Sequence, residues 1–407
     1  MRIGIHEDDK VRRKKFRIFH SRLFLILILL FLLEPNYLEE IGVLDRIYTY
    51  GSFIFTVLLI GIIIWKKSLS KSIIWSFAYF GTIFIVTLFQ NSGNLFYYMK
   101  SNFAALAMCL VFALWIEKDP IILFDSISVF EIYVYINLAT IIAFPYVDSY
   151  YTTTWFLGFK NFHIRTILPI VCISIIRSYI GFGHLTIRNL VLIICSGLTF
   201  ALNGSATSLV GFSAFLGMLF IFHRKNTELP GFINLRNSMI LYVILFIIIV
   251  VNQDISRFSF LIENILERNL TLTSRTRIWN LTFNLLRGHF LTGYGYLSST
   301  DYRELYTSVF NHPHNYFLYN LMTGGLVLLG IVMVGYLLAD HQLRKNTKKI
   351  YGKIVLACLF SFLVMGITES LVGTILLYPI LILGMEFDKL DQIPYGKGKA
   401  KVIVLKR

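Results

Sequence analysis

The sequence contains few charged residues and few cysteines. Of its 407 residues only 15% are charged and 56% are hydrophobic, whereas an ordinary soluble domain is about 25% charged and about 45–50% apolar. This balance excludes a soluble globular enzyme and a disordered chain. The four cysteines (Cys109, Cys172, Cys195 and Cys358) lie in apolar stretches and lack metal-ligand spacing. We therefore exclude a disulfide scaffold and expect the thiols to be packing residues.

The hydrophobic residues occur in long blocks such as 23–33, 240–251 and 324–339. A transmembrane β-barrel would instead alternate over segments of about ten residues, whereas a bilayer-crossing helix needs roughly 20 mainly apolar residues. We predict an all-α polytopic membrane protein that forms a single domain over 1–407, with about twelve spans. The expected spans lie near 17–34, 50–65, 72–90, 102–117, 125–144, 162–180, 188–202, 208–222, 239–252, 315–339, 352–369 and 372–387.

The distribution of basic residues predicts the orientation. If the N-terminus is cytoplasmic and the spans alternate, 28 of the 38 Lys and Arg residues fall in cytoplasmic segments. Cytoplasmic loops retain such an excess, so both termini are expected inside the cytoplasmic (inner) membrane. The net charge of +15 thus reflects topology, with the lipid bilayer and not nucleic acid as partner. A basic N-terminus runs into 23–33 without a small-residue cleavage site, which predicts an uncleaved first span.

Residues 253–314 form the one long loop in this map, on the outer face. A loop of roughly sixty residues is usually functional or disordered, and this one is rich in aromatic residues, Leu and Arg, which favours order. The apolar spacing between Ser274 and Arg287 predicts a helix with Ser274 as its N-cap. We expect this helix to lie along the membrane surface.

Two arginines open that helix, in the segment Ser-Arg-Thr-Arg-Ile-Trp at 274–279. The guanidinium fork of Arg275 or Arg277 is suited to phosphate because it binds two oxygens at once. The alternative is an interfacial helix whose arginines extend to lipid headgroups, beside Trp279. The spacing by itself leaves both interpretations open.

The end of the loop carries a histidine pair. His312 and His314 flank Pro313 and precede Asn315. Histidine suits proton transfer near neutral pH, and Pro313 can restrain His312 and open a helix with His314 in its first turn. The alternative is a helix-capping cluster with incidental histidines. A metal site is a weaker interpretation, since the two are not four apart and no carboxylate cluster lies close in sequence; we expect no metal and no cofactor.

Three other segments are polar within apolar surroundings. The Gly-X-Gly turn in 288–296 permits unusual backbone conformations but is not a dinucleotide fingerprint, because no strand–helix unit surrounds it. The stretch 203–208 is either a tight turn or a re-entrant substrate contact. The segment 156–161, with Lys160 and nearby Arg165, places cations at another outer mouth. For the last two the alternative is a solvated loop.

The order of these motifs resembles the O-antigen ligase and polymerase superfamily. The arginine segment at 274–279, the Gly-X-Gly turn, the His-Asn-Tyr at 314–316 and the Gly-Gly at 324–325 follow one another over about fifty residues. The similarity is best over 273–335. The Gly-Phe-Lys-Asn segment at 158–161 also resembles that family's Gly-x-Lys-Asn loop.

The resemblance implies a glycosyltransferase that takes polyprenyl-diphosphate-linked glycans on the outer face of the membrane. It implies that Arg275 holds the diphosphate and that His314 is the base that activates the acceptor hydroxyl. The remaining substrate-binding candidates are Arg277, Arg165, Lys160, Asn315, His312 and Trp279. Two departures stand out: Ser-Ala-Thr at 205–207 where many members have Ser-Arg-Thr, and His-Phe at 289–290 where many have Pro. Arg165 is the candidate replacement for the missing arginine.

We therefore expect a polymerase of undecaprenyl-type, diphosphate-linked repeat units that makes capsular polysaccharide, exopolysaccharide or O-antigen chains without a metal. A flippase and a chain-length regulator are expected partner proteins. A composition heavy in Ile, Phe, Lys and Asn suits a low-GC Gram-positive bacterium, which has no lipid core to receive a ligated chain. The alternative is an O-antigen ligase. An alternative from another class is a flippase or transporter, which internal repeats and midplane charge would favour; neither is evident in the sequence.

Overall fold

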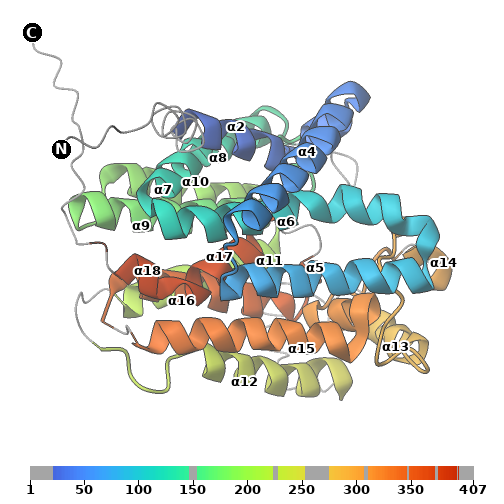
Figure 1. Cartoon of the computed structure of the whole chain (residues 1–407). Helices are drawn as coiled ribbons and strands as arrows, with labels where there is room; N and C mark the ends of the chain where they lie inside the picture. The colour runs from blue at the N-terminus through green and yellow to red at the C-terminus, as the bar shows by residue number, and fades with distance from the viewer. Residues whose placement is uncertain are drawn as a thin grey trace, which may run out of the picture.

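The computed structural model describes residues 22–145, 154–222, 228–252, 275–306, 310–345, 348–371, 375–391 and 393. Every regular element within these ranges is a helix (Figure 1). The prediction of an all-α fold is therefore confirmed for the described part of the chain.

The helices of the first half lie mostly within the predicted spans. They are α2 (Arg22–Leu32), α3 (Asn36–Glu39), α4 (Gly42–Lys66), α5 (Lys71–Gln90), η1 (Ser92–Asn94), α6 (Leu95–Lys118), α7 (Pro120–Ile127), η2 (Ser128–Phe130), α8 (Glu131–Ala143), α9 (His163–Phe182), α10 (Ile187–Leu202) and α11 (Ala206–Ile221). The helices of the second half are α12 (Leu235–Leu245), the π-helix η3 (Phe246–Val251), α13 (Arg275–Leu285), α14 (Ser299–Leu305), α15 (Tyr316–Lys345), α16 (Ile350–Gly366), α17 (Leu377–Met385) and α18 (Phe387–Asp391).

Among the described residues, six helical stretches are long and apolar enough to cross a membrane. They are Gly42–Lys66, Lys71–Gln90, Ser92–Lys118, Pro120–Ala143, His163–Phe182 and Tyr316–Lys345. Five further apolar helices have 10–17 residues, short of the roughly 20 residues that a straight span needs. Each of the twelve predicted spans overlaps a helix, but the number twelve stays a prediction.

Local chemistry explains where several helices begin and end. The Ser70 hydroxyl accepts a hydrogen bond from the Ile73 amide at the start of α5. Asp119 caps α7 in the same way and is followed by Pro120 at the first helical position, where the missing N–H costs nothing. Gly183, with φ +73°, ends α9 in the left-handed conformation, for which glycine has no steric penalty.

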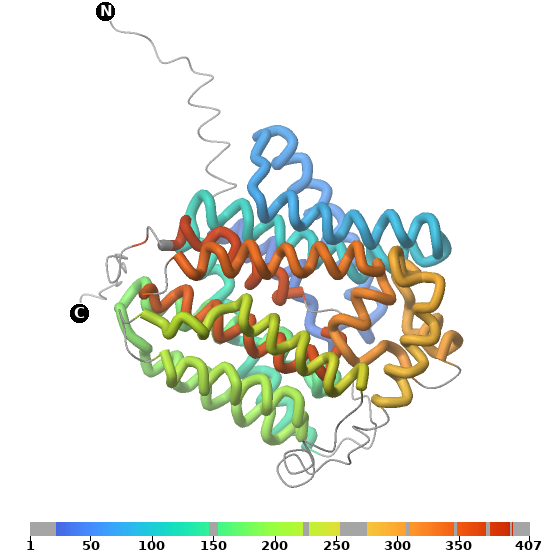
Figure 2. Tube along the Cα trace, turned by 90° about the horizontal axis from the view of Figure 1, so that it is seen from below, coloured from blue at the N-terminus to red at the C-terminus, as the bar shows by residue number. Residues whose placement is uncertain are grey.

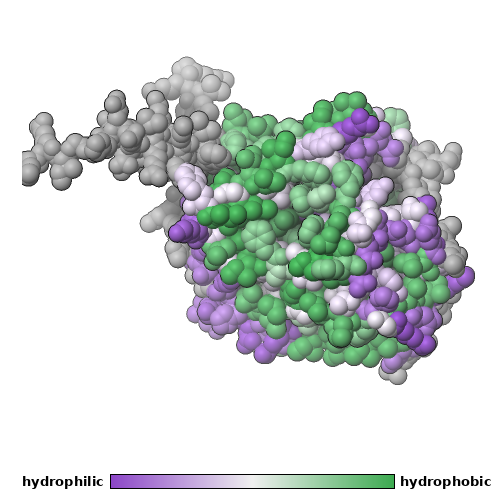
Figure 3. All heavy atoms as spheres, turned by 45° about the vertical axis from the view of Figure 1, so that its right-hand side comes forward, coloured by the Kyte–Doolittle hydropathy of each residue, from purple (hydrophilic) through white to green (hydrophobic). Residues whose placement is uncertain are grey.

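The surface matches a chain that lies in a bilayer. In Figure 3 a hydrophobic band runs across the visible face and is bordered by hydrophilic areas on both sides. Large apolar side chains remain exposed along the outer helices, for example Ile64 and Trp65 of α4 and Phe89 of α5. Because a soluble protein rarely exposes extended apolar surface, this arrangement indicates an integral membrane protein.

One end of the bundle gathers the segments of the predicted outer loop. Helices α13 and α14 lie there, next to the beginning of α15 (Figures 1 and 2). The predicted helix at 274–287 is confirmed as α13, whereas its expected cap Ser274 lies outside the described residues. Residues 253–274 and 307–309 of the loop also lie outside them. The loop's full length and its position on the membrane surface therefore stay predictions.

A glycine pair breaks α15 near its start. Gly324 and Gly325 have non-helical backbone angles, and Gly325 has φ +63°. A Cβ atom on Gly325 would lie 2.2 Å from the carbonyl carbon and oxygen of Leu291. The Leu326 amide donates to the Phe290 carbonyl at 2.9 Å. The kink therefore allows residues 290–292 to pack directly on the backbone of α15.

The Gly-X-Gly turn is the other half of this contact. Gly293 has φ +70°, and the next amide, Tyr294, donates to the Met322 carbonyl at 2.7 Å. A Cβ atom on Gly295 would lie 2.6 Å from the Cα of Thr87 on α5. Glycine is therefore required at both positions, and the turn ties the segment after α13 to α5 and α15.

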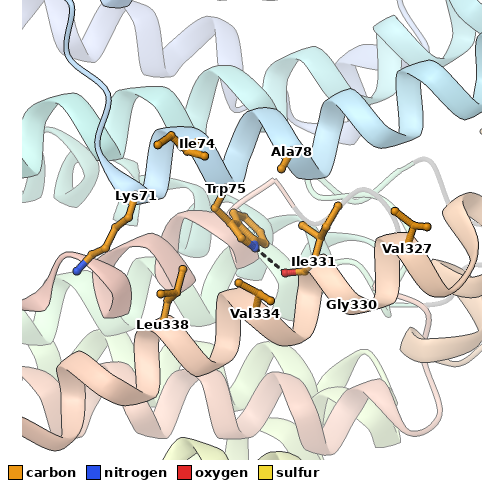
Figure 4. A pocket seen from close by; sticks show the side chains of 9 residues that line it. All are labelled: Lys71, Ile74, Trp75, Ala78, Val327, Gly330, Ile331, Val334 and Leu338. Atoms are coloured by element: carbon orange, nitrogen blue, oxygen red, sulfur yellow. Dashed lines mark hydrogen bonds between the residues drawn. The ribbon is translucent and has the colours of Figure 1, made fainter.

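A shallow apolar groove of about 430 Å³ runs between α5 and α15 (Figure 4). Trp75 crosses it and donates from its indole nitrogen to the Ile331 carbonyl at 2.8 Å. Gly330 lines the groove and has open space at its Cβ position. This glycine therefore has no packing role of the kind found at Gly325.

Candidate active site

A buried carboxylate is the centre of the candidate site. Glu369 follows the end of α16, and its side chain is 4% exposed. Its Oε1 lies 2.9 Å from Nη2 of Arg275. Its Oε2 lies 3.8 Å from Nη2 of Arg165 and 3.9 Å from Nδ1 of His314. Three residues predicted from distant parts of the sequence therefore converge on one carboxyl group.

An amide and a hydroxyl extend this group. Nδ2 of Asn161 donates to Oε1 of Glu369 at 3.1 Å, and the Ser205 hydroxyl donates to Oδ1 of Asn161 at 2.8 Å. Ser205 also caps α11 by accepting from the Ser208 amide. The polar stretch 203–208 thus contains a turn, which is one of its predicted interpretations, and it leads into the cap of α11. Most of its polar side chains are buried and not solvated, and Ser205 links the turn through Asn161 to the candidate site.

Arg165 is held from two sides. It belongs to α9, and its side chain is only 6% exposed. Its guanidinium carbon lies 4.4 Å from the centre of the Phe162 ring, a cation–π arrangement. Since a buried cation is costly without an anion, Glu369 explains why Arg165 is tolerated there. Arg165 is connected through Glu369 and Asn161 to Ser205, in the turn where the family resemblance predicts an arginine.

His314 has a strained backbone. Its φ is +49°, a left-handed conformation that non-glycine residues rarely adopt and that clusters at functional sites. Its amide donates to Nδ1 of His312 at 3.3 Å. The prediction that Pro313 opens a helix with His314 in the first turn is wrong, because α15 begins at Tyr316. A φ of that sign cannot belong to a right-handed helix.

The two imidazoles lie against each other. The ring centroids of His312 and His314 are 3.9 Å apart, and Nδ1 of His312 is 3.0 Å from the Ser370 hydroxyl. Burial lowers the pKa of His314 to about 4, with Glu369 opposing this shift and the arginines adding to it. Burial, followed by the neighbouring positive charges, also lowers the pKa of His312 well below its usual value. Both rings are therefore neutral at physiological pH, and a neutral imidazole can accept a proton.

The donor atoms of His312, His314 and Glu369 lie within 4.8 Å of one another, a grouping that could hold a metal ion. No carboxylate cluster lies close to these histidines in the sequence, but the fold brings the Glu369 carboxylate to them. However, the same carboxylate already binds Arg275 and faces Arg165. Two fixed positive charges at this distance oppose a divalent cation, so the surroundings suit an anion better.

The other predicted residues occupy different settings. Oδ1 of Asn315 accepts from the Leu318 amide at the start of α15, and its Nδ2 donates to the Ile367 carbonyl. Asn315 therefore links α15 to the segment that carries Glu369. Trp279 is fully buried in an apolar cluster, which favours a packing role. Arg277 is exposed, and Lys160 is half-buried with its carbonyl accepting from Asn203.

Glu369 was not among the site residues predicted from the sequence. A usable signal existed, because Glu369 is the only acidic residue between Asp340 and Glu386, in the middle of apolar blocks. An ionisable residue in such surroundings is by default a functional candidate. We call the set Asn161, Arg165, Arg275, His312, His314, Glu369 and Ser370 the Glu369 cluster.

A comparison with known families matches part of the chain. The family model described as O-antigen ligase matches residues 190–333. The match begins in α10 and ends within α15, so it includes Arg275 and His314 but neither Arg165 nor Glu369. None of the curated proteins compared with the chain matches it.

The helical fold and its exposed apolar surface define an integral membrane protein in which two arginines and a histidine surround a buried carboxylate. The match over residues 190–333 supports a relationship to the O-antigen ligase and polymerase superfamily. Members of this family are glycosyltransferase-like enzymes of polysaccharide biosynthesis. The resemblance drawn from the motifs is therefore confirmed.

Proposed function

We propose that this protein polymerises polyprenyl-diphosphate-linked oligosaccharide repeat units at the outer face of the cytoplasmic membrane, without a metal. The observation that carries the proposal is the convergence of Arg165, Arg275 and His314 on Glu369. Two guanidinium groups against a single carboxylate leave a net positive charge, which suits a diphosphate. A neutral histidine beside them suits the acceptor hydroxyl.

The reaction would be a direct displacement at the anomeric carbon of the donor glycan. The acceptor oxygen forms a bond to that carbon while the bond from the carbon to the diphosphate oxygen breaks. The diphosphate leaves with the electron pair, and the acceptor proton passes to His314. Since Nδ1 of His314 faces Glu369, Nε2 is the nitrogen that receives the proton. We expect inversion of configuration, and a trapped covalent glycosyl-enzyme would contradict this step.

The arrangement accounts for the two difficult parts of this chemistry. Charge develops on the leaving diphosphate, and fixed cations in a poorly hydrated site stabilise it far better than they would in water. A sugar hydroxyl is a weak nucleophile, and a positioned general base contributes about 10²–10⁴-fold. Arg275 and His314 are 17% and 23% exposed, so both side chains are partly open to a substrate.

The experiment is transfer by the purified full-length protein in lipid nanodiscs with a defined diphosphate-linked repeat unit. A ladder of products that grows by whole repeat units supports a polymerase. A single addition to a separate acceptor, without a ladder, supports the ligase alternative. Arg275→Ala and His314→Ala should leave only unpolymerised repeat units, whereas Arg287→Ala, an exposed arginine just beyond α13, should behave like the wild type.

The flippase alternative gives a different result in cells. A polymerase defect leaves single repeat units on the lipid carrier at the outer face, where an added glycosidase reaches them. A flippase defect leaves the same units on the cytoplasmic side, protected from that enzyme. Normal polymer length in both the Arg275→Ala and His314→Ala strains would refute the assignment of this site.

A further inference from the structure

Glu369 has more positive partners than its single charge requires. Arg275 and Arg165 are both permanently charged and approach its two oxygens at 2.9 and 3.8 Å. Asn161 donates to the same carboxylate. Buried charges are stable only when they are paired, so in the absence of substrate Glu369 is the group that allows both guanidiniums to stay inside the protein.

The carboxylate also stands where a substrate anion must bind. A guanidinium binds carboxylate and phosphate oxygens with the same fork of N–H donors. Arg275 therefore cannot offer its Nη2 fully to a diphosphate while it holds Oε1 of Glu369. Its side chain is 17% exposed while that of Glu369 is 4% exposed, so an incoming anion meets the arginine before it meets the carboxylate.

We propose that Glu369 is a displaceable counter-ion for the donor diphosphate and a positioning residue for His314. The proposal rests on the proposed function. In the free protein Glu369 pairs with the arginines. When the diphosphate takes their N–H groups, the repelled carboxylate shifts toward His314, whose Nδ1 lies 3.9 Å from Oε2. Glu369 then stabilises the imidazolium that forms when His314 takes the acceptor proton, and it remains unprotonated throughout.

Two neighbours make this exchange possible without loss of the fold. Asn161 holds Oε1 at 3.1 Å and is itself held by Ser205, so the carboxylate keeps a neutral partner after the arginines leave. Nδ1 of His314 is buried and has no hydrogen-bond partner among the described residues. A buried polar nitrogen of this kind is costly, and a shift of Glu369 toward it satisfies both groups.

The first test measures anion binding without any sugar chemistry. Inorganic pyrophosphate is titrated calorimetrically into the full chain in nanodiscs. Glu369→Gln removes the competing charge and keeps the shape, so pyrophosphate should bind at least about tenfold more tightly, which is about 1.4 kcal/mol. Glu304→Gln removes an exposed carboxylate of α14 and should leave the pyrophosphate affinity unchanged. This control separates competition at the site from the effect of a change in the protein's net charge.

The second test is kinetic. Glu369→Gln should lower KM for the lipid-linked donor, because the carboxylate that competes with the diphosphate for the arginines is gone. It should also lower kcat by at least about tenfold, because the same carboxylate no longer stabilises the His314 imidazolium. Glu369→Asp should recover part of kcat. A carboxylate that only holds the fold together would reduce both the amount of folded protein and the activity without tightening donor binding.

The outcomes separate this inference from the proposed function. Equal or weaker pyrophosphate binding by Glu369→Gln overturns the counter-ion role, while Arg275→Ala can still show that the diphosphate site exists. If the wild type binds no pyrophosphate and Arg275→Ala changes nothing, the proposed function fails instead. Should Glu369→Gln not fold, Asn161→Ala removes the neutral partner that the displaced carboxylate keeps and should weaken pyrophosphate binding severalfold. Unchanged or tighter binding overturns the inference.

Discussion

Gly325→Ala offers a test of how the outer loop is fixed to the membrane domain. The new Cβ atom would lie 2.2 Å from the backbone carbon and oxygen of Leu291, closer than any real contact, and neither atom can rotate away. The residue also has φ +63°, a conformation that costs an L-residue about 1–2 kcal/mol. The substitution therefore forces the Gly-X-Gly turn away from α15.

The size of the effect follows from the bonds that hold this turn. Separation breaks the bonds from the Leu326 amide to the Phe290 carbonyl and from the Tyr294 amide to the Met322 carbonyl, each worth about 1 kcal/mol net. With the backbone strain, docking is weakened by about 3–4 kcal/mol. This corresponds to more than a hundredfold change in the docking equilibrium, since 1.4 kcal/mol is about tenfold.

Two assays on the same preparation check this reasoning. Hydrogen exchange at the Tyr294 amide should become at least about a hundredfold faster, and glycosyl transfer should fall by a similar factor because the turn follows α13, which begins with Arg275. Gly330→Ala is the matched control in the same helix, because nothing lies within 4 Å of its Cβ position. Wild-type protection and activity in Gly325→Ala would refute the docking argument.

Three further predictions concern the Glu369 cluster. Arg275→Ala should reduce kcat by about 10²–10³-fold, as expected for the loss of one donor to a developing anion, while Arg275→Lys should restore only part of it; full recovery with Lys would show that the guanidinium fork is not used. The pKa of His314 is lowered to about 4, so kcat/KM should stay level above about pH 5 and fall as His314 becomes protonated near pH 4. Because the negative charge of Glu369 raises this pKa, Glu369→Gln should move the acid limb of the profile to lower pH. A shift to higher pH would contradict the assignment of a negative charge to Glu369. Treatment with a chelator should leave transfer unchanged, and activity that is lost with the chelator and restored by a divalent metal would mean that His312, His314 and Glu369 bind that ion.

Much of the fold could be predicted because its signals are local. The apolar blocks are long enough to require helices in a bilayer, and a helix was found at every expected span. The helix at 275–285 also followed from the spacing of its own apolar residues. The number of spans was harder to predict, because α10, α11 and α16 are shorter than a straight crossing, and hydropathy does not show how a short helix is seated.

The candidate site was predicted only in part. Arg275, Arg165, His312 and His314 were singled out from motifs because their side chains suit phosphate binding and proton transfer. Their convergence could not be predicted, since it depends on how α9, α13 and the start of α15 pack around the end of α16. The left-handed backbone of His314 was missed because Pro313 is equally compatible with the start of a helix.

By itself the sequence determined the class of the protein, because its apolar helices need a bilayer and its motifs follow a family-like order. It also predicted the orientation from the basic residues, and it predicted which side chains suit phosphate binding and proton transfer. Only the tertiary structure decided that one carboxylate, Glu369, collects these groups, and that two pairs of glycines tie the segment after α13 to α5 and α15. The physical reason is that a buried charge and a backbone-to-backbone contact are defined by what surrounds them in space. Neither feature produces a periodic pattern in the sequence from which it could be predicted.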